Sequence, residues 1–308
     1  MATILALAAC GGIAQALDPG SMQDGGGIDV GQLDGGGMDA GQLDGGGMDA
    51  GRPDGGGMDA GQPDGGGMDA GQPDGGAQSA GIWHPVSGTS WQWQLQGTID
   101  TTVDAAMYDI DLFDAPQSVV DALHAKGRIV VCYFSAGTYE NWRPDAPSFP
   151  SSAIGNAVAG WPGEWWVDTT SSAIRSIMQA RLDRAAQKSC DGVEPDNVDA
   201  YTNNPGFPLT ASTQLDYNSF IAREAHARNL SVGLKNDVDQ VAALEPGFDW
   251  ALNEECSKYN ECATLLPFVQ ANKAVFHAEY ATVCPAPVAG HSLILKHLNL
   301  DAWRIVCP

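Results

Sequence analysis

From residue 83 onward, short apolar runs alternate with amphipathic segments. Such runs are typical of parallel strands that are buried on both faces, and they predict eight strands, at residues 90–95, 106–113, 128–135, 191–201, 231–236, 250–253, 274–280 and 302–307. Apolar residues at helical spacing predict helices between most of the strands, at residues 117–126, 171–188, 212–229, 238–244 and 263–272. This alternation predicts an α/β fold, a closed (β/α)₈ TIM barrel rather than an open sheet.

The first 80 residues show no such pattern. Residues 21–80 are almost entirely Asp, Gly, Met, Ala, Gln and Pro, contain no aromatic residue, and repeat a decapeptide close to DGGGMDAGQP. A segment of this composition cannot bury enough apolar surface to offset its ordering entropy. We therefore expect three parts: a signal-like or lipobox-like segment at 1–20, a disordered Gly/Asp-rich repeat linker at 21–80, and the barrel at 81–308.

The N-terminal segment indicates export. Residues 1–10 form an apolar run that is too short to span a bilayer and resembles the end of a secretory signal. The sequence Leu7-Ala8-Ala9-Cys10 resembles a bacterial lipobox, although no Lys or Arg precedes it. We therefore expect a secreted protein or a cell-surface lipoprotein of a bacterial envelope, with a lipid anchor at Cys10 as its contact with the membrane.

Net charge and cysteine content indicate what kind of ligand the domain binds and whether it contains disulfides. Eleven Asp and one Arg in residues 21–80, together with Asp18, account for −11 of the net charge of −23, which leaves −12 for residues 81–308. An acidic domain argues against nucleic acid as a partner and suits a neutral or cationic ligand. Six cysteines lie in this domain and predict up to three disulfides, with buried free thiols as the alternative. The most plausible pair is Cys256 with Cys262, because it closes one short loop.

The active site of a (β/α)₈ barrel lies at the C-terminal ends of the strands. Nearly every predicted strand here ends in a carboxylate or an amide: Asp109, Asp111, Glu194, Asp196, Asn197, Asp199, Asn236, Asp237, Asn253, Glu254, Glu255 and Glu279. Two carboxylates that face one cavity can hydrolyse a glycosidic bond, because one protonates the leaving oxygen while the other acts as nucleophile or base. The histidines are scattered along the sequence, and no GxSxG, GxGxxG or P-loop motif is present. We therefore expect neither a metal nor a cofactor.

The segments YDIDLFD, CYFSAGTYENWRPD, GVEPDNVDAY, GLKND and FDWALNEEC occur in this order along the chain. They resemble glycoside hydrolase family 114, whose members are endo-α-1,4-polygalactosaminidase-like barrels, and the resemblance covers about residues 83–307. It implies a nucleophile at the end of the fourth strand, which matches Asp196, and an acid/base at the end of the sixth, which matches Glu254. Glu255 remains an alternative acid/base, because only one of two successive strand residues should face the cavity.

The resemblance also implies residues that contact the substrate, by their position at strand ends: Asp109, Asp111, Tyr133, Lys235, Asn236, Glu255, Glu279 and Tyr280. The implied substrate is an α-1,4-linked, galactosamine-rich exopolysaccharide, cationic where it is deacetylated, cut internally with retention by a monomeric enzyme. Aromatic side chains pack on sugar rings, and we expect at least one of Trp165 and Trp166 to be exposed. The alternatives are a surface-displayed, non-catalytic polysaccharide-binding protein and a glycosidase for another α-linked sugar.

Overall fold

The computed structural model describes residues 81–308. The predicted signal segment, lipid anchor and repeat linker fall on residues 1–80, outside the described residues. Nine strands form the main sheet, in the order β1-β2-β3-β7-β8-β9-β10-β11-β12. They are β1 (Trp91–Gln94), β2 (Met107–Asp111), β3 (Ile129–Ser135), β7 (Gly192–Asp196), β8 (Ser231–Lys235), β9 (Trp250–Glu254), β10 (Val275–Glu279), β11 (His291–Lys296) and β12 (Arg304–Val306).

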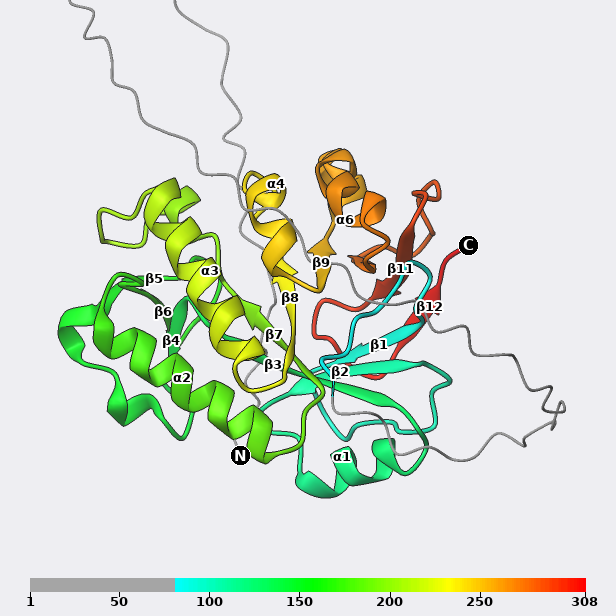
Figure 1. The fold of residues 1–308 in the computed structure, drawn as a ribbon, viewed down its shortest axis with the longest axis horizontal. Coiled ribbons are helices and arrows are strands. Elements are labelled where there is room, and N and C mark those ends of the chain that lie inside the picture. The colour runs from blue at the N-terminus through cyan, green and yellow to red at the C-terminus, as the bar shows by residue number, and fades with distance from the viewer. Residues whose placement is uncertain (1–80) are drawn as a thin grey trace, which may run out of the picture. The chain divides into compact units, whose positions relative to one another are not determined.

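The two ends of this sheet approach each other, so that the sheet nearly closes into a barrel (Figure 1). Directly after β1, the backbone N–H groups of Leu95 and Gln96 donate to the carbonyl of Leu300 at 3.0 and 3.2 Å. The indole of Trp91 on β1 donates to the carbonyl of Ser292 on β11 at 2.8 Å. The α/β fold of TIM-barrel type that the sequence predicts is therefore confirmed.

The strand prediction was right for the first seven strands and wrong for the eighth. The strand predicted at 302–307 is β12, which pairs antiparallel with β11, whereas β11 is the eighth parallel strand. Within residues 81–308, no α-helix separates β10 from β11 or β1 from β2. Helical alternation therefore carries no signal for β11, and three of the eight barrel units, those of β1, β10 and β11, lack their helix.

The helices pack against the outer face of the sheet and are α1 (Gln117–His124), α2 (Ser172–Gln187), α3 (Ala211–His226), α4 (Val241–Leu244), α5 (Cys256–Tyr259) and α6 (Leu266–Gln270). The two long helices, α2 and α3, lie side by side (Figure 1). α2 buries the apolar residues whose helical spacing predicts it, Ile174, Ile177, Met178, Leu182 and Ala185. α3 begins with a capping box, in which the hydroxyl of Thr210 accepts from the backbone N–H of Thr213 at 3.2 Å.

A small antiparallel sheet is inserted between β3 and α2, with the order β4-β6-β5. Its strands are β4 (Thr138–Glu140), β5 (Ile154–Ala157) and β6 (Glu164–Val167). The sequence predicts only loops in this stretch. The strands are short and their apolar pattern is interrupted by Pro and Gly, which weakens any periodic signal. Since β4 follows the C-terminal end of β3, the insertion lies at the end of the barrel where a site is expected.

Alternate residues of each parallel strand face the barrel interior. The inward-facing apolar residues form one core cluster, which includes Trp93, Met107, Leu252 and Phe276. Outward-facing residues pack with the helices in a second, larger cluster. Asp109 lies two residues after Met107, and Glu254 two residues after Leu252, so both carboxylates face the interior.

Three disulfides link the six cysteines of the described residues: Cys132–Cys190, Cys256–Cys262 and Cys284–Cys307. The prediction of up to three disulfides and the predicted Cys256–Cys262 pair are confirmed. Among residues 81–308, no helix is both long enough and apolar enough to cross a lipid bilayer.

Candidate active site

The ammonium group of Lys235, the last residue of β8, lies among three carboxylates inside the barrel. Its Nζ is 2.8 Å from Oε1 of Glu194, 3.2 Å from Oδ1 of Asp196 and 3.2 Å from Oε2 of Glu254. Only 2% of the lysine side chain is exposed. We call these four residues the Lys235 cluster. Because the oxygens of Asp196 and Glu254 each lie 3.2 Å from one nitrogen, they are separated by at most twice that distance, 6.4 Å.

Asp196 ends β7 and receives hydrogen bonds from three sides. Its Oδ2 accepts from the hydroxyl of Tyr133 at 3.1 Å, and its Oδ1 accepts from the backbone N–H of Asn197 at 2.8 Å as well as contacting Lys235. Its side chain is 21% exposed, more than that of any other member of the cluster. Asp196 is therefore the carboxylate of the cluster that a ligand in the barrel mouth reaches first.

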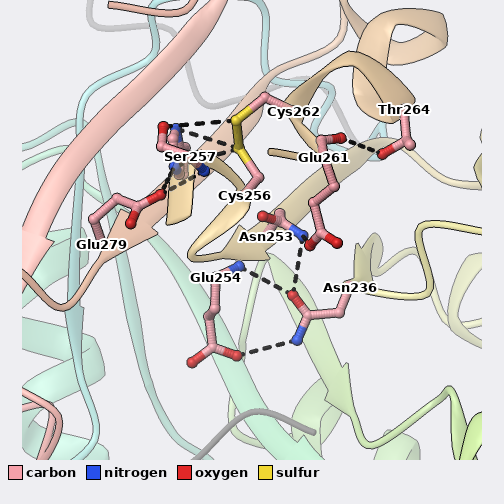
Figure 2. Close-up of a disulfide and its surroundings, with 10 residues drawn as sticks. Asn236, Asn253, Glu254, Cys256, Ser257, Glu261, Cys262, Thr264 and Glu279 are labelled. Carbon is pink, nitrogen blue, oxygen red and sulfur yellow. Dashed lines mark hydrogen bonds and ion pairs between the residues drawn. A yellow bond between two sulfur atoms is a disulfide. The ribbon is translucent and has the colours of Figure 1, made fainter. Parts of the chain in front are cut away.

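Glu254 ends β9 and is held by one asparagine at two points. The Nδ2 of Asn236 donates to its Oε2 at 3.1 Å, and its backbone N–H donates to Oδ1 of Asn236 at 3.0 Å (Figure 2). The hydroxyl of Tyr280 donates to its other oxygen, Oε1. These contacts fix the carboxylate next to Lys235 and leave it little freedom to turn away.

The chain turns sharply after each strand that supplies this cluster. Asn197, Asn236 and Glu255 directly follow β7, β8 and β9, and their φ angles of 59°, 47° and 62° lie in the left-handed region. Asparagine tolerates this conformation better than most residues, whereas glutamate rarely adopts it. A Cβ on Gly137 would lie 1.7 Å from the carbonyl oxygen of Asn197, so the approach of these two segments requires glycine.

Two buried acids lie deepest in this region of the barrel, Glu194 of the cluster and Asp109 next to it. Glu194 accepts from the indole N–H of Trp93 at 3.1 Å, and its burial raises its pKa to about 7 despite the nearby Lys235. Burial and the neighbouring Glu194 carboxylate hold the pKa of Asp109 well above its usual range. Neither oxygen of Asp109 accepts a hydrogen bond from a donor in the described part of the chain. Burial and the neighbouring carboxylate thus both favour the protonated form of Asp109.

A further carboxyl group, Glu164 on β6, reaches this region from the inserted sheet. It accepts from the hydroxyl of Thr138 and from the Nδ2 of Asn197 at 3.4 Å, and burial raises its pKa to about 8. Sequence reasoning missed Glu164, because a carboxylate outside the predicted strands carries no positional signal. It also left Glu194 and Asn197 without a role, although both lie in the strand-end motif around Asp196.

The structure brings five of the eight residues predicted to contact substrate to the Lys235 cluster or its direct neighbours: Asp109, Tyr133, Lys235, Asn236 and Tyr280. The other three carboxylates are engaged elsewhere. Asp111 forms an ion pair with Nη2 of Arg143 at 2.7 Å, and Glu255 forms one with Nζ of Lys258 at 2.8 Å. Glu279 accepts from the backbone N–H of Ser257 at 2.8 Å on the outer face of the sheet.

Alternation explains the placement of the glutamates. Tyr280 and Ala278 face the barrel interior, so Glu279 between them must face outward. In the same way Glu254 faces the interior and its neighbour Glu255 does not. A position at a strand end is thus not sufficient to place a side chain in the site.

The aromatic residues differ from the prediction. Trp166 is buried, and Trp165 is half-buried because it packs against Tyr139, with ring centroids 5.7 Å apart. Neither is exposed. The large exposed aromatic of this region is Trp142, at 50%, which lies directly after β4.

With this geometry established, comparison with known proteins gives a clear result. The model of glycoside-hydrolase family GH114 matches residues 73–308, and the chain belongs to this family. It is therefore a glycoside hydrolase with a TIM-barrel-like fold.

Individual proteins agree with this assignment. The chain is 42% identical to Ega3 of Aspergillus fumigatus, solved as a complex with galactosamine, over 75% of this chain and 100% of that one, with a TM-score of 0.71. The glycoside hydrolase domain of PelA from Pseudomonas aeruginosa shares the fold, with 9% identity, a TM-score of 0.56, and 70% and 97% of the two chains covered. An uncharacterized protein of Deinococcus radiodurans is 27% identical over 226 residues, which are 62% of this chain and 72% of that protein.

Proposed function

We propose that this protein cleaves internal bonds of an α-1,4-linked, galactosamine-rich exopolysaccharide with retention, using Asp196 as nucleophile and Glu254 as acid/base. The observation that carries the proposal is the contact of both carboxylates with Lys235, which keeps their oxygens within 6.4 Å. Retaining glycosidases hold their two carboxyl groups about 5–5.5 Å apart and inverting enzymes about 6.5–9.5 Å apart. The 42% identity to a protein solved with galactosamine supports the sugar.

The reaction proceeds in two steps. In the first, Asp196 attacks the anomeric carbon and forms a glycosyl ester, while Glu254 gives its proton to the leaving glycosidic oxygen. In the second, Glu254 takes a proton from water, the water oxygen attacks the anomeric carbon, and Asp196 leaves as a carboxylate. Glu254 thus ends the cycle protonated and ready for the next bond.

Lys235 suits this cycle because it contacts both carboxylates. Before the first step the negative charge of the pair lies on Asp196, and after that step it lies on Glu254, since the ester of Asp196 is neutral. An ammonium group at 3.2 Å from each stabilises the charge in both places without moving. Tyr133 and Tyr280 donate to the two carboxylates in the same way, one to each.

The test is to digest α-1,4-polygalactosamine and to follow the first-formed anomer by proton NMR and the product sizes by chromatography. We expect the α-anomer first and a range of oligosaccharides early in the reaction. A first-formed β-anomer would contradict retention, and release of monomer alone would contradict internal cleavage. Binding of the polymer without any product would favour the polysaccharide-binding alternative.

The charge of the domain bears on which form of the polymer is preferred. Residues 81–308 carry −12, and ammonium groups of a deacetylated chain can form charge-assisted hydrogen bonds worth about 1.5–3 kcal/mol with carboxylates. We expect faster cleavage of polygalactosamine before chemical N-acetylation than after it, and weaker binding at high salt. Equal rates on both polymers at both ionic strengths would remove the electrostatic part of the proposal.

We also propose that the protein acts as a monomer outside the cytoplasm, either secreted or held at a bacterial surface through Cys10. Three disulfides support an oxidising compartment. Cell fractionation tests the anchor: Cys10→Ser should move the protein from the membrane fraction to the soluble fraction. An unchanged distribution would contradict the anchor and leave the catalytic proposal untouched.

A further inference from the structure

A second cluster of reactive side chains lies on the outer face of the sheet, behind the end of β9. It consists of Cys256, Cys262, His277 and His291, each of which places one sulfur or ring nitrogen within 4.8 Å of the others. We call it the Cys-His corner. Sequence reasoning found the histidines scattered and suggested no metal, because His277 and His291 come from different strands. The parallel pairing of β10 with β11 brings them together.

The four residues come from four neighbouring elements. Cys256 begins α5, and Cys262 begins the short 3₁₀ helix Cys262–Leu265; the disulfide between them lies next to the Asn253–Glu254 end of β9 (Figure 2). His277 lies on β10, with Nδ1 and Nε2 at 3.8 and 3.4 Å from the sulfur of Cys256. The rings of His277 and His291 meet edge to face, with centroids 5.4 Å apart.

The disulfide accounts for the cysteines but not for the histidines. The Nε2 of His277 is 2.7 Å from Oε1 of Glu279, so Nδ1, which lies 3.8 Å from the sulfur of Cys256, is the nitrogen that remains for a metal. A carboxylate behind a histidine is the usual second partner of a metal-binding imidazole. The Nδ1 of His291 is buried and has no hydrogen-bond partner among the described residues. A buried nitrogen without a partner is unfavourable, and a metal would supply the missing partner.

We propose that the Cys-His corner of the reduced protein is a Cys₂His₂ site for Zn²⁺. A dithiol reductant gives two electrons to the Cys256–Cys262 bond, the bond breaks, two thiols form, and the reductant becomes a disulfide. Zn²⁺ then binds two thiolates and two imidazoles, and the thiol protons pass to water. Zinc holds sulfur and nitrogen at about 2.0–2.3 Å, so after reduction the two sulfurs move apart to about 3.8 Å, while ligand atoms up to 4.8 Å apart close in by about 1 Å. The ion joins α5 and the 3₁₀ helix to β10 and β11.

The experiment treats the whole chain with a dithiol under argon, removes the reductant, and titrates Zn²⁺ and Co²⁺. We expect one ion per chain and the visible absorption of tetrahedral Co²⁺ with thiolate ligands. His291→Ala should lose this site, and Glu279→Gln should bind about 10–100-fold more weakly. The matched control is Cys284→Ser with Cys307→Ser, which removes another disulfide and keeps the four ligands; it should bind as the wild type does.

Several results would overturn the proposal. One is a reduced wild-type protein that binds no ion, and another is binding of equal affinity and spectrum by the wild type and His291→Ala. If reduction unfolds the chain, near-ultraviolet circular dichroism measures whether Zn²⁺ refolds it. Zn²⁺ should restore the folded spectrum of the wild type but not of His291→Ala, and recovery of both or of neither would contradict the site.

Discussion

Two groups of buried carboxylates lie near the same end of the barrel, and cations balance their negative charge in different ways. In the first, Arg143 contacts Asp111 at 2.7 Å and Glu140 at 2.9 Å, and Arg181 lies 3.9 Å from Glu140. We call these four residues the Arg143 cluster. In the Lys235 cluster a single ammonium group faces three carboxylates, and Asp109 lies behind them.

The number of cations per carboxylate decides what each group can do. The Arg143 cluster has two guanidinium groups for its two buried carboxylates, and the planar fork of Arg143 binds Asp111 through two nitrogens, at 2.9 and 2.7 Å. Outside the cluster, Arg181 also pairs with the partly exposed Asp145 at 2.8 Å, and Arg143 with the exposed Asp114 at 3.4 Å. The Lys235 cluster has more acids than its one cation can balance, which favours protonation of the most buried of them. Glu194, with a pKa of about 7, is one. Matched charges stabilise the fold, whereas unmatched ones keep protons available for catalysis.

The largest expected effect is on catalysis at the unmatched group. Asp196→Asn or Glu254→Gln should lower kcat by about 10²–10⁴-fold with little change in the free energy of unfolding, because these groups act in the transition state. Hydrolysis rates and urea unfolding of purified variants measure both. Glu255→Gln is the control and should keep most of its activity, since its carboxylate pairs with Lys258. An inactive Glu255→Gln beside a normal Glu254→Gln would show that the acid/base is the neighbouring residue.

The next largest effect is the loss of stability expected when the ion pairs of the Arg143 cluster are broken. Arg143→Met should lower the free energy of unfolding by about 3–5 kcal/mol, because it leaves the buried Asp111 without its cation and Glu140 with Arg181 at 3.9 Å alone. The matched control is Arg128→Met, which breaks an ion pair with Asp104 whose side chains are 30% and 94% exposed and should cost about 1 kcal/mol or less. Urea unfolding followed by tryptophan fluorescence compares the two. Equal costs would mean that the Arg143 cluster does not stabilise the fold.

The sequence predicts most of this fold but only part of this site. Buried parallel strands such as β3 and helices with long apolar stripes such as α2 follow from local pattern, and seven strands and the Cys256–Cys262 disulfide are confirmed. The catalytic roles of Asp196 and Glu254 come from a family resemblance rather than from pattern, and they remain proposals. The contact of both with Lys235 needs three strands in one closed sheet, which no local pattern specifies.

Other features depend on geometry that a sequence does not show. Glu279 ends a strand as Glu254 does, but its register turns it toward the helices. Glu164 and Trp165 lie on short strands that give no periodic signal. The Cys-His corner brings His277 and His291 together through the pairing of β10 with β11. The sequence does not predict this pairing, because no helix lies between the two strands.

The titration of buried acids gives an effect on stability with a defined sign. Burial raises the pKa of Glu194, Asp199 and Asp237 to about 7 and that of Glu164 to about 8, above the value of about 4 in an unfolded chain. An acid with a raised pKa stabilises the fold most below its unfolded pKa, and this stability is lost as the pH rises through the folded value. The pKa of His291, lowered to about 4 by burial, acts in the opposite sense but is a single group.

Urea unfolding should therefore show a higher free energy of unfolding at pH 5 than at pH 7. Glu164→Gln should make this dependence shallower, because an amide does not titrate. The control is Asp239→Asn, at an exposed position, which should leave the slope close to that of the wild type. A stability that rises from pH 5 to pH 7 would contradict the excess of protonated acids in the Lys235 cluster and around it.

The smallest effect on the free energy of unfolding at pH 5 is expected from substitution of Asp109, whose raised pKa favours its neutral form. Asp109→Asn should change the free energy of unfolding by about 1 kcal/mol or less at that pH, because the amide N–H₂ can donate to Glu194 as a protonated carboxyl does. Glu194→Gln, measured at pH 8 where Glu194 is ionised, removes the carboxylate that pairs with Lys235 at 2.8 Å and should cost far more. Raising the pH then separates a neutral Asp109 from an ionised one. If Asp109 stays protonated in the fold, unfolding lets it ionise, so rising pH costs the wild type this contribution in addition to that of the other buried acids, whereas Asp109→Asn loses only the latter. The free energy of unfolding of the variant should thus rise relative to that of the wild type from pH 5 to pH 7. A relative fall over this range would show that Asp109 is a buried carboxylate and that Lys235 balances four charges.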